Sequence, residues 1–236
     1  TERKEVVEIA KETISLLSAQ QFRDVKIIDI GVFEDLDLAT QINRVNKIVG
    51  EASWMPKEVL LVSIHVNSGG GNRIESWFED DNEEGRKLAS AILGHVSNIT
   101  GIPGGRVLPD TQNRHGRLGI LRDTAATAVL IECGFIDTPS NADILKDPKR
   151  DDGFALGIVQ GICQYLGAMF NTGGAFLDVP AGTQLDADVR LLKSFGLVQG
   201  YPDGRYYPER PMTRGEVTQV LARILRAQAA GETWMK

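Results

Sequence analysis

The sequence predicts an α/β fold with a twisted, mostly parallel sheet flanked by helices, followed by a second, small α-helical domain. Two observations support this fold class. Two long apolar runs, VLLVSIHV at 59–66 and TAVLIECGF at 127–135, are typical of strands in a buried parallel sheet. Around these runs, apolar residues recur at helical spacing, so that strands alternate with helices along the chain.

Helical segments surround the two strands in the first domain. The apolar side chains of each segment recur at every third or fourth position, which is the period of an amphipathic helix. We therefore expect helices at 2–17, 37–52, 84–99 and 153–170. Two shorter runs, VKIIDI at 25–30 and IESWF at 74–78, predict further strands.

The C-terminal part of the chain predicts a separate small domain. The stretch NTGGA at 171–175 is typical of a flexible linker, so we expect one domain at 1–170 and another at 176–236. Within the second domain, helical spacing up to Phe195, a Tyr-Pro-Asp-Gly turn and a helix after Thr213 predict a helical hairpin.

The composition excludes several classes of protein. With 236 residues, 42% of them hydrophobic, the chain can bury one sizeable core, and its net charge of -6 argues against a general nucleic-acid binder. No run approaches the roughly 18 apolar residues of a membrane helix, so we expect no membrane partner. The start TERKEVVEIA is too charged for a secretory signal, so any export depends on a segment outside this sequence. Cys133 and Cys163 form no CxxC motif, which predicts buried free thiols.

Two polar residues stand at the carboxyl ends of the two apolar strands. His65 follows VLLVSI, and Glu132 follows AVLI. Ligands of open α/β sheets bind beyond the carboxyl ends of the strands, and imidazole with carboxylate is a common donor combination for Zn²⁺. These residues suggest a metal hydrolase. The alternative is a structural histidine and a glutamate that only caps a turn, because the chain has no HExxH, GxSxG or P-loop motif.

Several segments resemble one enzyme family. VSIHVNS followed by IESWF, VLIECGFIDTPSNADIL, and the helix DLATQINRVNKI are similar to segments of zinc-dependent N-acetylmuramoyl-L-alanine amidases of bacterial autolysins and phage endolysins. The resemblance runs from residue 2 to about residue 168. It implies an α/β catalytic domain that hydrolyses the amide bond between N-acetylmuramic acid and L-alanine in peptidoglycan.

The resemblance also implies roles for individual residues. The family holds zinc with two histidines and a glutamate, and a second glutamate is the catalytic base. His65 matches the second histidine and Glu132 the catalytic glutamate, while Glu2 matches the ligand glutamate because it precedes the Ile9-Ala10 pair by the family's spacing. Activation of water by zinc and proton transfer by Glu132 are thereby implied.

The family's first zinc histidine lies in a Gly-His-Gly turn upstream of the ligand glutamate, and this sequence contains no such segment. We therefore expect the chain to be a fragment of a longer enzyme; the alternative is a degenerate, weakly active relative. Of the remaining histidines, His95 falls within a helix, and His115 falls in a basic loop where a surface role is the simpler interpretation.

Other polar residues are weaker candidates for binding the substrate. The loop RVLPDTQNRHGRLGILRD is rich in arginine, and Arg114 and Arg117 could bind carboxylates of the peptide stem. A solvated basic loop is an equally good interpretation. Asn67 and Glu75 fall near the same strand ends by sequence, where polar residues often only satisfy backbone groups.

The second domain resembles one S-layer homology module. FLDVP at 176–180 and GLVQGYPDGRYYPERPMTRGE at 196–216 match its usual motifs. The resemblance implies that Arg214, with Asp178 and Glu216 nearby, binds an acidic secondary cell-wall polysaccharide. Thr213 and Glu216 also have the spacing of a helix capping box, so their role could be purely structural.

These expectations combine into one functional hypothesis and its rivals. The hypothesis is a zinc amidase that degrades peptidoglycan in the cell wall, as a secreted autolysin or as an endolysin released from the cytoplasm, and is tethered to the wall by its second domain. One alternative is a catalytically impaired amidase-like wall-binding protein. Another is a zinc peptidase that cuts within the peptide stem. Metal content separates the first rival from the enzyme.

Overall fold

The computed structural model describes residues 2–20, 25–32, 34, 36–51, 59–147, 152–168, 170, 174–176, 178–179, 183–201 and 205–229. It divides the chain into two compact units, 1–170 and 171–236. Most of the predicted linker at 171–175 and most of the Tyr-Pro-Asp-Gly turn fall outside the described residues. No helix in the described part of the chain is long and apolar enough to span a membrane.

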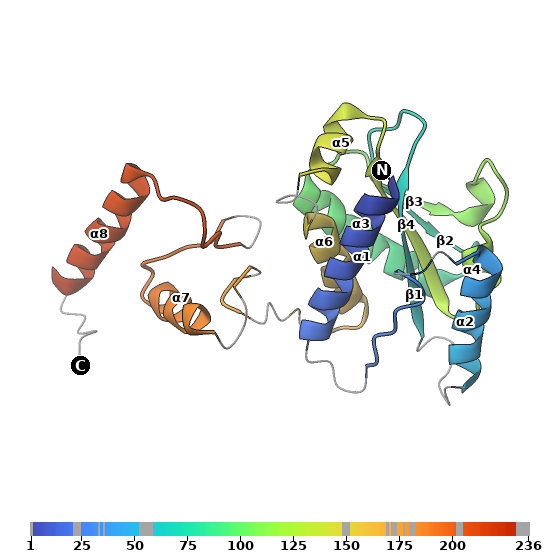
Figure 1. Cartoon of the computed structure of the whole chain (residues 1–236), viewed down its shortest axis with the longest axis horizontal. Coiled ribbons are helices and arrows are strands. Elements are labelled where there is room, and N and C mark those ends of the chain that lie inside the picture. The colour runs from blue at the N-terminus through green and yellow to red at the C-terminus, as the bar shows by residue number, and fades with distance from the viewer. Residues whose placement is uncertain are drawn as a thin grey trace. The chain divides into compact units, whose positions relative to one another are not determined.

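The first unit is built on a four-stranded sheet (Figure 1). Its strand order is β1 (Leu60–Asn67), β4 (Thr127–Phe135), β2 (Glu75–Phe78) and β3 (Arg106–Pro109). The pairs β1 with β4 and β2 with β3 are parallel, whereas β2 runs antiparallel to β4. The predicted α/β class with a mostly parallel sheet is confirmed.

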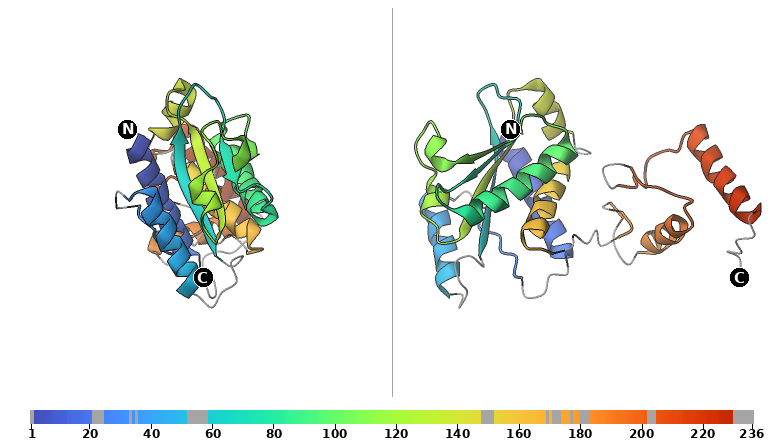
Figure 2. Two further views of the ribbon diagram at one scale, coloured as in Figure 1. Left: turned by 90° about the vertical axis from the view of Figure 1, so that its right-hand side faces the viewer. Right: turned by 180° about the vertical axis from the view of Figure 1, so that it is seen from behind.

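Helices cover both faces of this sheet, as the views in Figures 1 and 2 show. One face packs on α1 (Glu2–Ala19), α3 (Glu83–Thr100) and α6 (Asp152–Tyr165), which enclose the largest hydrophobic core. The other face packs on α2 (Leu38–Glu51) and the short α4 (Gly119–Arg122). A 3-10 turn at Asp110–Gln112 follows β3, and α5 (Pro139–Leu145) follows β4.

Two glycines bring α3 and α6 into backbone contact. A Cβ atom on Gly157 would lie 2.6 Å from Val96 Cα, and a Cβ atom on Gly161 would lie 2.4 Å from Ile92 Cα. A methyl group does not fit at either position. The face of α6 that carries Gly157 and Gly161 therefore packs unusually closely against α3.

The structure departs from the sequence prediction at two strands. VKIIDI at 25–30 is irregular rather than a strand, and Ile30 instead packs beside Val45 and Val49 of α2. The apolar strand β1 lies at the edge of the sheet, so its residues are mostly half-buried, whereas β4 is buried along almost its whole length. Strand pairing joins residues far apart in sequence, and local patterns do not determine it.

The second unit contains α7 (Gln184–Ser194) and α8 (Arg214–Ala229). The side chain of Thr183 caps α7 by accepting a hydrogen bond from Asp186 N. The predicted capping box of α8 is present, because Thr213 N donates to Glu216 Oε2 at 2.7 Å and Glu216 N donates to Thr213 Oγ1 at 3.2 Å. A small core of Phe176, Val179 and Val189 holds this unit.

Candidate functional site

Three acidic or imidazole side chains form a row across the sheet. His65 of β1 is opposed to Glu132 of β4, and Glu132 is opposed to Glu75 of β2. Opposed residues project to the same face of a sheet. Glu132 alternates with Ile131 and shares its face with Leu130, which packs towards α4, so the row lies on the α2/α4 face. The sheet thus brings His65 and Glu132 together.

The imidazole of His65 is accessible and favours its neutral form. Its ring reaches solvent, and its Nε2 lies 3.1 Å from Ser63 Oγ, two residues earlier on the same face of β1. Partial desolvation by the surrounding protein lowers the pKa of His65 below its usual value. A neutral imidazole with one nitrogen held by a hydroxyl is the form that binds a metal ion or accepts a proton.

Glu132 lies half-buried at the end of the buried strand β4. Burial, and then the negative charge of Glu132, raise the pKa of the neighbouring Cys133 thiol far above its usual range. Cys133 and Cys163 are both buried and free, as the sequence predicted. Cys133 projects into the core on the opposite face from Glu132, so the thiol is not a nucleophile for this site.

Glu75 closes the other side of the row and is almost completely buried, with 4% of its surface exposed. Its Oε1 accepts a hydrogen bond from Arg73 Nε at 2.5 Å, and its Oε2 accepts one from Asn67 Nδ2 at 3.2 Å. The guanidinium of Arg73 also lies 4.8 Å from the ring centroid of Phe135. Sequence reasoning placed Asn67 and Glu75 near the site, and the structure shows the hydrogen bond that joins them.

A glycine-rich loop after β1 is held beside the row. Gly69 N and Gly70 N donate hydrogen bonds to Asp137 Oδ2 at 2.7 and 2.9 Å. The hydroxyl of Thr138 donates to the carbonyl oxygen of Gly71 at 2.5 Å. Sequence reasoning did not single out Asp137, whose only signal was its position two residues after β4. These bonds fix the loop that borders the carboxyl ends of β1 and β4.

The arginines of the loop after β3 separate into two groups. Arg106 lies opposite Glu75 and extends the row to β3. Arg117 instead binds the buried Asp110, with Nε to Oδ2 at 2.9 Å, and lies 3.7 Å from Glu79. Arg114 is exposed in the same loop. Because β3 runs antiparallel to β4, this loop follows the end of β3 that is remote from Glu132. The structure therefore does not bring Arg114 and Arg117 next to His65 and Glu132.

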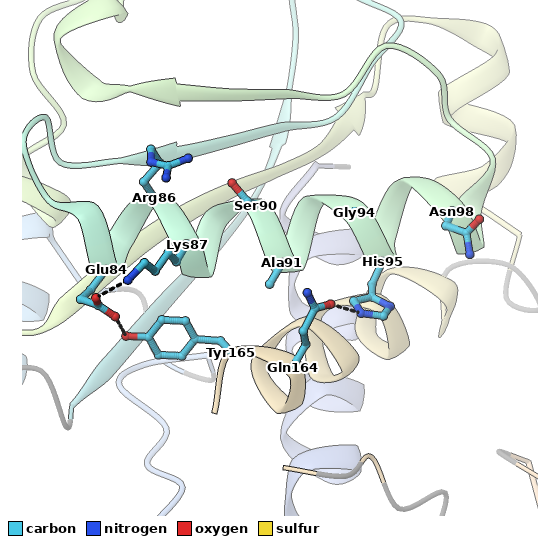
Figure 3. A pocket seen from close by; sticks show the side chains of 10 residues that line it. All are labelled: Glu84, Arg86, Lys87, Ser90, Ala91, Gly94, His95, Asn98, Gln164 and Tyr165. Carbon is cyan, nitrogen blue, oxygen red and sulfur yellow. Dashed lines mark hydrogen bonds and ion pairs between the residues drawn. The ribbon is translucent and has the colours of Figure 1, made fainter. Parts of the chain in front are cut away.

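The other histidines lie away from the row. His115 is exposed in the loop after β3. His95 lies on α3, where its Nε2 is 2.7 Å from Gln164 Oε1 in an open groove of about 890 Å³ (Figure 3). Glu84 in this groove already accepts hydrogen bonds from Lys87 and Tyr165. The groove is formed by α3 and α6, which cover the opposite face of the sheet from His65 and Glu132.

The described side chains do not provide a full set of metal ligands. His65 and Glu132 are of the types that bind zinc, but the described residues contain no group of three histidine, cysteine or acidic side chains that could hold a metal ion. Glu2 begins α1, and its side chain falls outside the described residues. Figures 1 and 2 place the start of α1 at the end of the sheet where β1 finishes.

Comparison with known families now identifies the class of protein. The family model for N-acetylmuramoyl-L-alanine amidase matches residues 1–164, and the model for the S-layer homology domain matches residues 175–218. The chain therefore belongs to the N-acetylmuramoyl-L-alanine amidase family and carries an S-layer homology domain.

Individual relatives agree with this assignment. The chain is 30% identical over 142 residues to the sporulation-specific N-acetylmuramoyl-L-alanine amidase of Bacillus subtilis (strain 168), covering 59% of this chain and 53% of that protein. It is 27% identical over 183 residues to the endolysin of Bacillus phage SPP1, covering 74% of this chain and 61% of that protein. The chain thus spans only about half to three-fifths of the length of these relatives.

Solved structures share the fold. The N-acetylmuramoyl-L-alanine amidase from Clostridium difficile 630 aligns with a TM-score of 0.57 at 27% identity, covering 71% of this chain and 84% of that one. The catalytic domain of CwlV, an N-acetylmuramoyl-L-alanine amidase from Bacillus (Paenibacillus) polymyxa var. colistinus, aligns with the same TM-score at 22% identity, covering 72% and 87%. The second likeness shows the fold alone.

Proposed function

We propose that this protein hydrolyses the amide bond between N-acetylmuramic acid and L-alanine in peptidoglycan, with zinc as its cofactor. The observation that supports this proposal is the opposed pair His65 and Glu132, at the carboxyl ends of β1 and β4 in a member of the amidase family. His65 and Glu2 would hold the metal together with a donor from outside the described side chains. Glu132 would be the catalytic base.

The described residues support a division of chemical work. A bound zinc ion would supply a Lewis acid that polarises the scissile carbonyl and makes water a better nucleophile. Glu132 would accept the proton of the attacking water and return it to the leaving amine of L-alanine. The hydroxyl of Ser63 would orient the imidazole of His65, and the lowered pKa of His65 keeps that ring available as a ligand.

The second unit would attach the enzyme to the outer wall. Arg214 is exposed at the start of α8, where a cation can reach a polymer. Asp178 and Glu216 have structural partners instead. The carboxylate of Asp178 accepts hydrogen bonds from Tyr206 N and Tyr207 N, and Glu216 caps α8. We infer that Arg214 binds an acidic secondary cell-wall polysaccharide, and that the protein acts at the cell surface.

A second candidate function is an amidase-like wall-binding protein that has lost catalysis. It is favoured by the observation that the described side chains supply no set of three metal donors. A zinc peptidase that cuts within the peptide stem is the third candidate. The two enzymes would share the metal but release different amino groups.

End-group analysis of digested peptidoglycan tests the proposal. The proposed amidase releases new amino-terminal L-alanine and leaves newly freed lactyl carboxyl groups on the glycan strands. A stem peptidase would expose other amino-terminal residues and leave L-alanine bound to the sugar. If incubation with peptidoglycan produces no new amino terminus, and the same preparation still sediments with purified walls, the result supports the wall-binding protein.

A further inference from the structure

We propose that Glu75 is a positioning residue for His65 and Glu132, and that it acts through a clamp formed by Arg73, Glu75 and Asn67. The inference rests on the proposed function, because it concerns the residues that the amidase reaction would use. It assigns Glu75 neither to the substrate nor to the metal. The clamp instead determines where the end of β1 lies relative to β4.

The end of β1 needs such a restraint. Among the described residues β1 pairs with β4 alone, and the register of this pairing shifts between His65 and Asn67. A strand that is paired on one side and bulged near its end has few backbone bonds to fix its last side chains. The bulge directly follows His65, so the direction of its imidazole depends on what holds Asn67.

The side chain of Asn67 reaches across the sheet to supply that restraint. Its Nδ2 donates to Glu75 Oε2 at 3.2 Å, although β4 lies between the strands that carry the two residues. The hydrogen bond therefore passes over β4 on the face that carries Glu132. Backbone bonds hold Asn67 as well, because Ile136 N donates to Asn67 O at 2.9 Å. The position of Asn67 is thus fixed from both β4 and β2.

The clamp requires a carboxylate at position 75. Burial of Glu75 is costly unless its charge is paired, and Arg73 Nε provides the pairing at 2.5 Å. Asn67 and Arg73 are both donors, so both oxygens of Glu75 must accept. In a glutamine, the one acceptor oxygen that Arg73 keeps leaves an amide N–H facing the Asn67 donor, so the two donors oppose each other. The second substitution Asn67→Asp restores the hydrogen bonds. The carboxylate of the aspartate accepts from the amide nitrogen of the new glutamine, while the oxygen of that glutamine still accepts from Arg73.

Nuclear magnetic resonance of the histidine rings tests the clamp in the full chain without any metal or substrate. The chain has three histidines, so the ring signals of His65 can be assigned with a His65→Gln variant. We expect Glu75→Gln to shift or split the His65 signals and to leave those of His115 in place. The double variant Asn67→Asp with Glu75→Gln should return the His65 signals towards their original positions. Glu84→Gln, which removes an ion-paired carboxylate on α3, is the matched control and should leave His65 unchanged.

Steady-state kinetics provide a second test, provided that the unmutated protein releases amino-terminal L-alanine from peptidoglycan. Loss of a group that orients the active residues typically costs about 10- to 100-fold in activity. We expect Glu75→Gln to lower kcat by this amount with little change in KM, and the double variant to recover it. If the unmutated protein releases no such amines, the proposed function fails. The histidine signals still decide whether the clamp positions His65.

Two outcomes of the resonance experiment would overturn the clamp. His65 signals that stay unchanged in Glu75→Gln, or that do not recover in the double variant, show that Glu75 does not position His65. If Glu75→Gln does not fold, Asn67→Ala removes the tether while keeping the ion pair between Arg73 and Glu75. Unchanged His65 signals in that variant overturn the inference in the same way.

Discussion

His65 and Glu132 occupy opposed positions on the adjacent parallel strands β1 and β4. The two residues are 67 positions apart in sequence, and only the pairing of these strands makes them neighbours. Because the pair lies at the carboxyl ends of both strands, the fold delivers an imidazole and a carboxylate to the edge where α/β sheets bind their ligands.

The first prediction concerns Glu132. Glu132→Gln keeps the size of the side chain but removes the proposed base, so release of L-alanine amines should fall by roughly 10²- to 10⁴-fold. Zinc content should stay at the level of the parent, because Glu132 is not proposed as a ligand. Amine release and elemental analysis on the same preparations check both statements. Activity equal to that of the parent would remove Glu132 from the mechanism.

The second prediction concerns the contact between α3 and α6. In Gly161→Ala the new Cβ would lie 2.4 Å from Ile92 Cα, so the helices must separate, and the free energy of unfolding should fall by about 1–3 kcal/mol. Gly94→Ala on α3 is the control, because a Cβ atom there meets nothing within 4 Å. The higher helix propensity of alanine should raise the free energy of unfolding by up to about 1 kcal/mol. Denaturant unfolding followed by circular dichroism compares the two. Equal effects would contradict the close packing.

The third prediction concerns the thiols. Burial raises the pKa of both Cys133 and Cys163, so at pH 8 each remains a protonated, inaccessible thiol. A chromogenic disulfide reagent should therefore detect no fast-reacting thiol in the folded protein and both thiols in guanidinium chloride. A thiol that reacts rapidly before unfolding would show that its helix or strand is packed differently.

The fourth prediction separates structure from binding at the start of α8. Thr213→Ala removes the cap and should cost about 1 kcal/mol of helix stability. Arg214→Ala should keep that stability, because the capping box does not use its side chain, but should weaken sedimentation with purified walls. Thermal unfolding and wall sedimentation are measured for both variants. Arg214→Ala that binds walls as strongly as the parent would exclude Arg214 as the ligand residue.

Much of the fold follows from local patterns. TAVLIECGF forms a strand over 127–135 as predicted, because a continuous apolar run suits a strand buried on both faces. The helix expected at 84–99 is found at Glu83–Thr100, with Asn82 as its cap. VKIIDI failed as a strand because β-structure needs a partner, and its Ile30 packs on α2 instead.

The site was only partly predictable for the same reason. The positions of His65 and Glu132 after apolar runs indicated a shared edge, but their register is a property of strand pairing. The clamp of Arg73, Glu75 and Asn67 spans three strands, so no local spacing reveals it. Arg117 illustrates the converse, since a basic loop suggested substrate binding whereas the side chain binds the buried Asp110.

The amount of zinc bound per chain decides whether His65 belongs to a metal site. Elemental analysis after dialysis would be made on the full-length product of the gene and on its His65→Ala variant. We expect about one zinc ion per chain in the unmutated protein, the stoichiometry of a single catalytic site, and a clear loss of zinc in His65→Ala. A gene product without zinc, or a His65→Ala variant that keeps all of it, would contradict a metal site at His65.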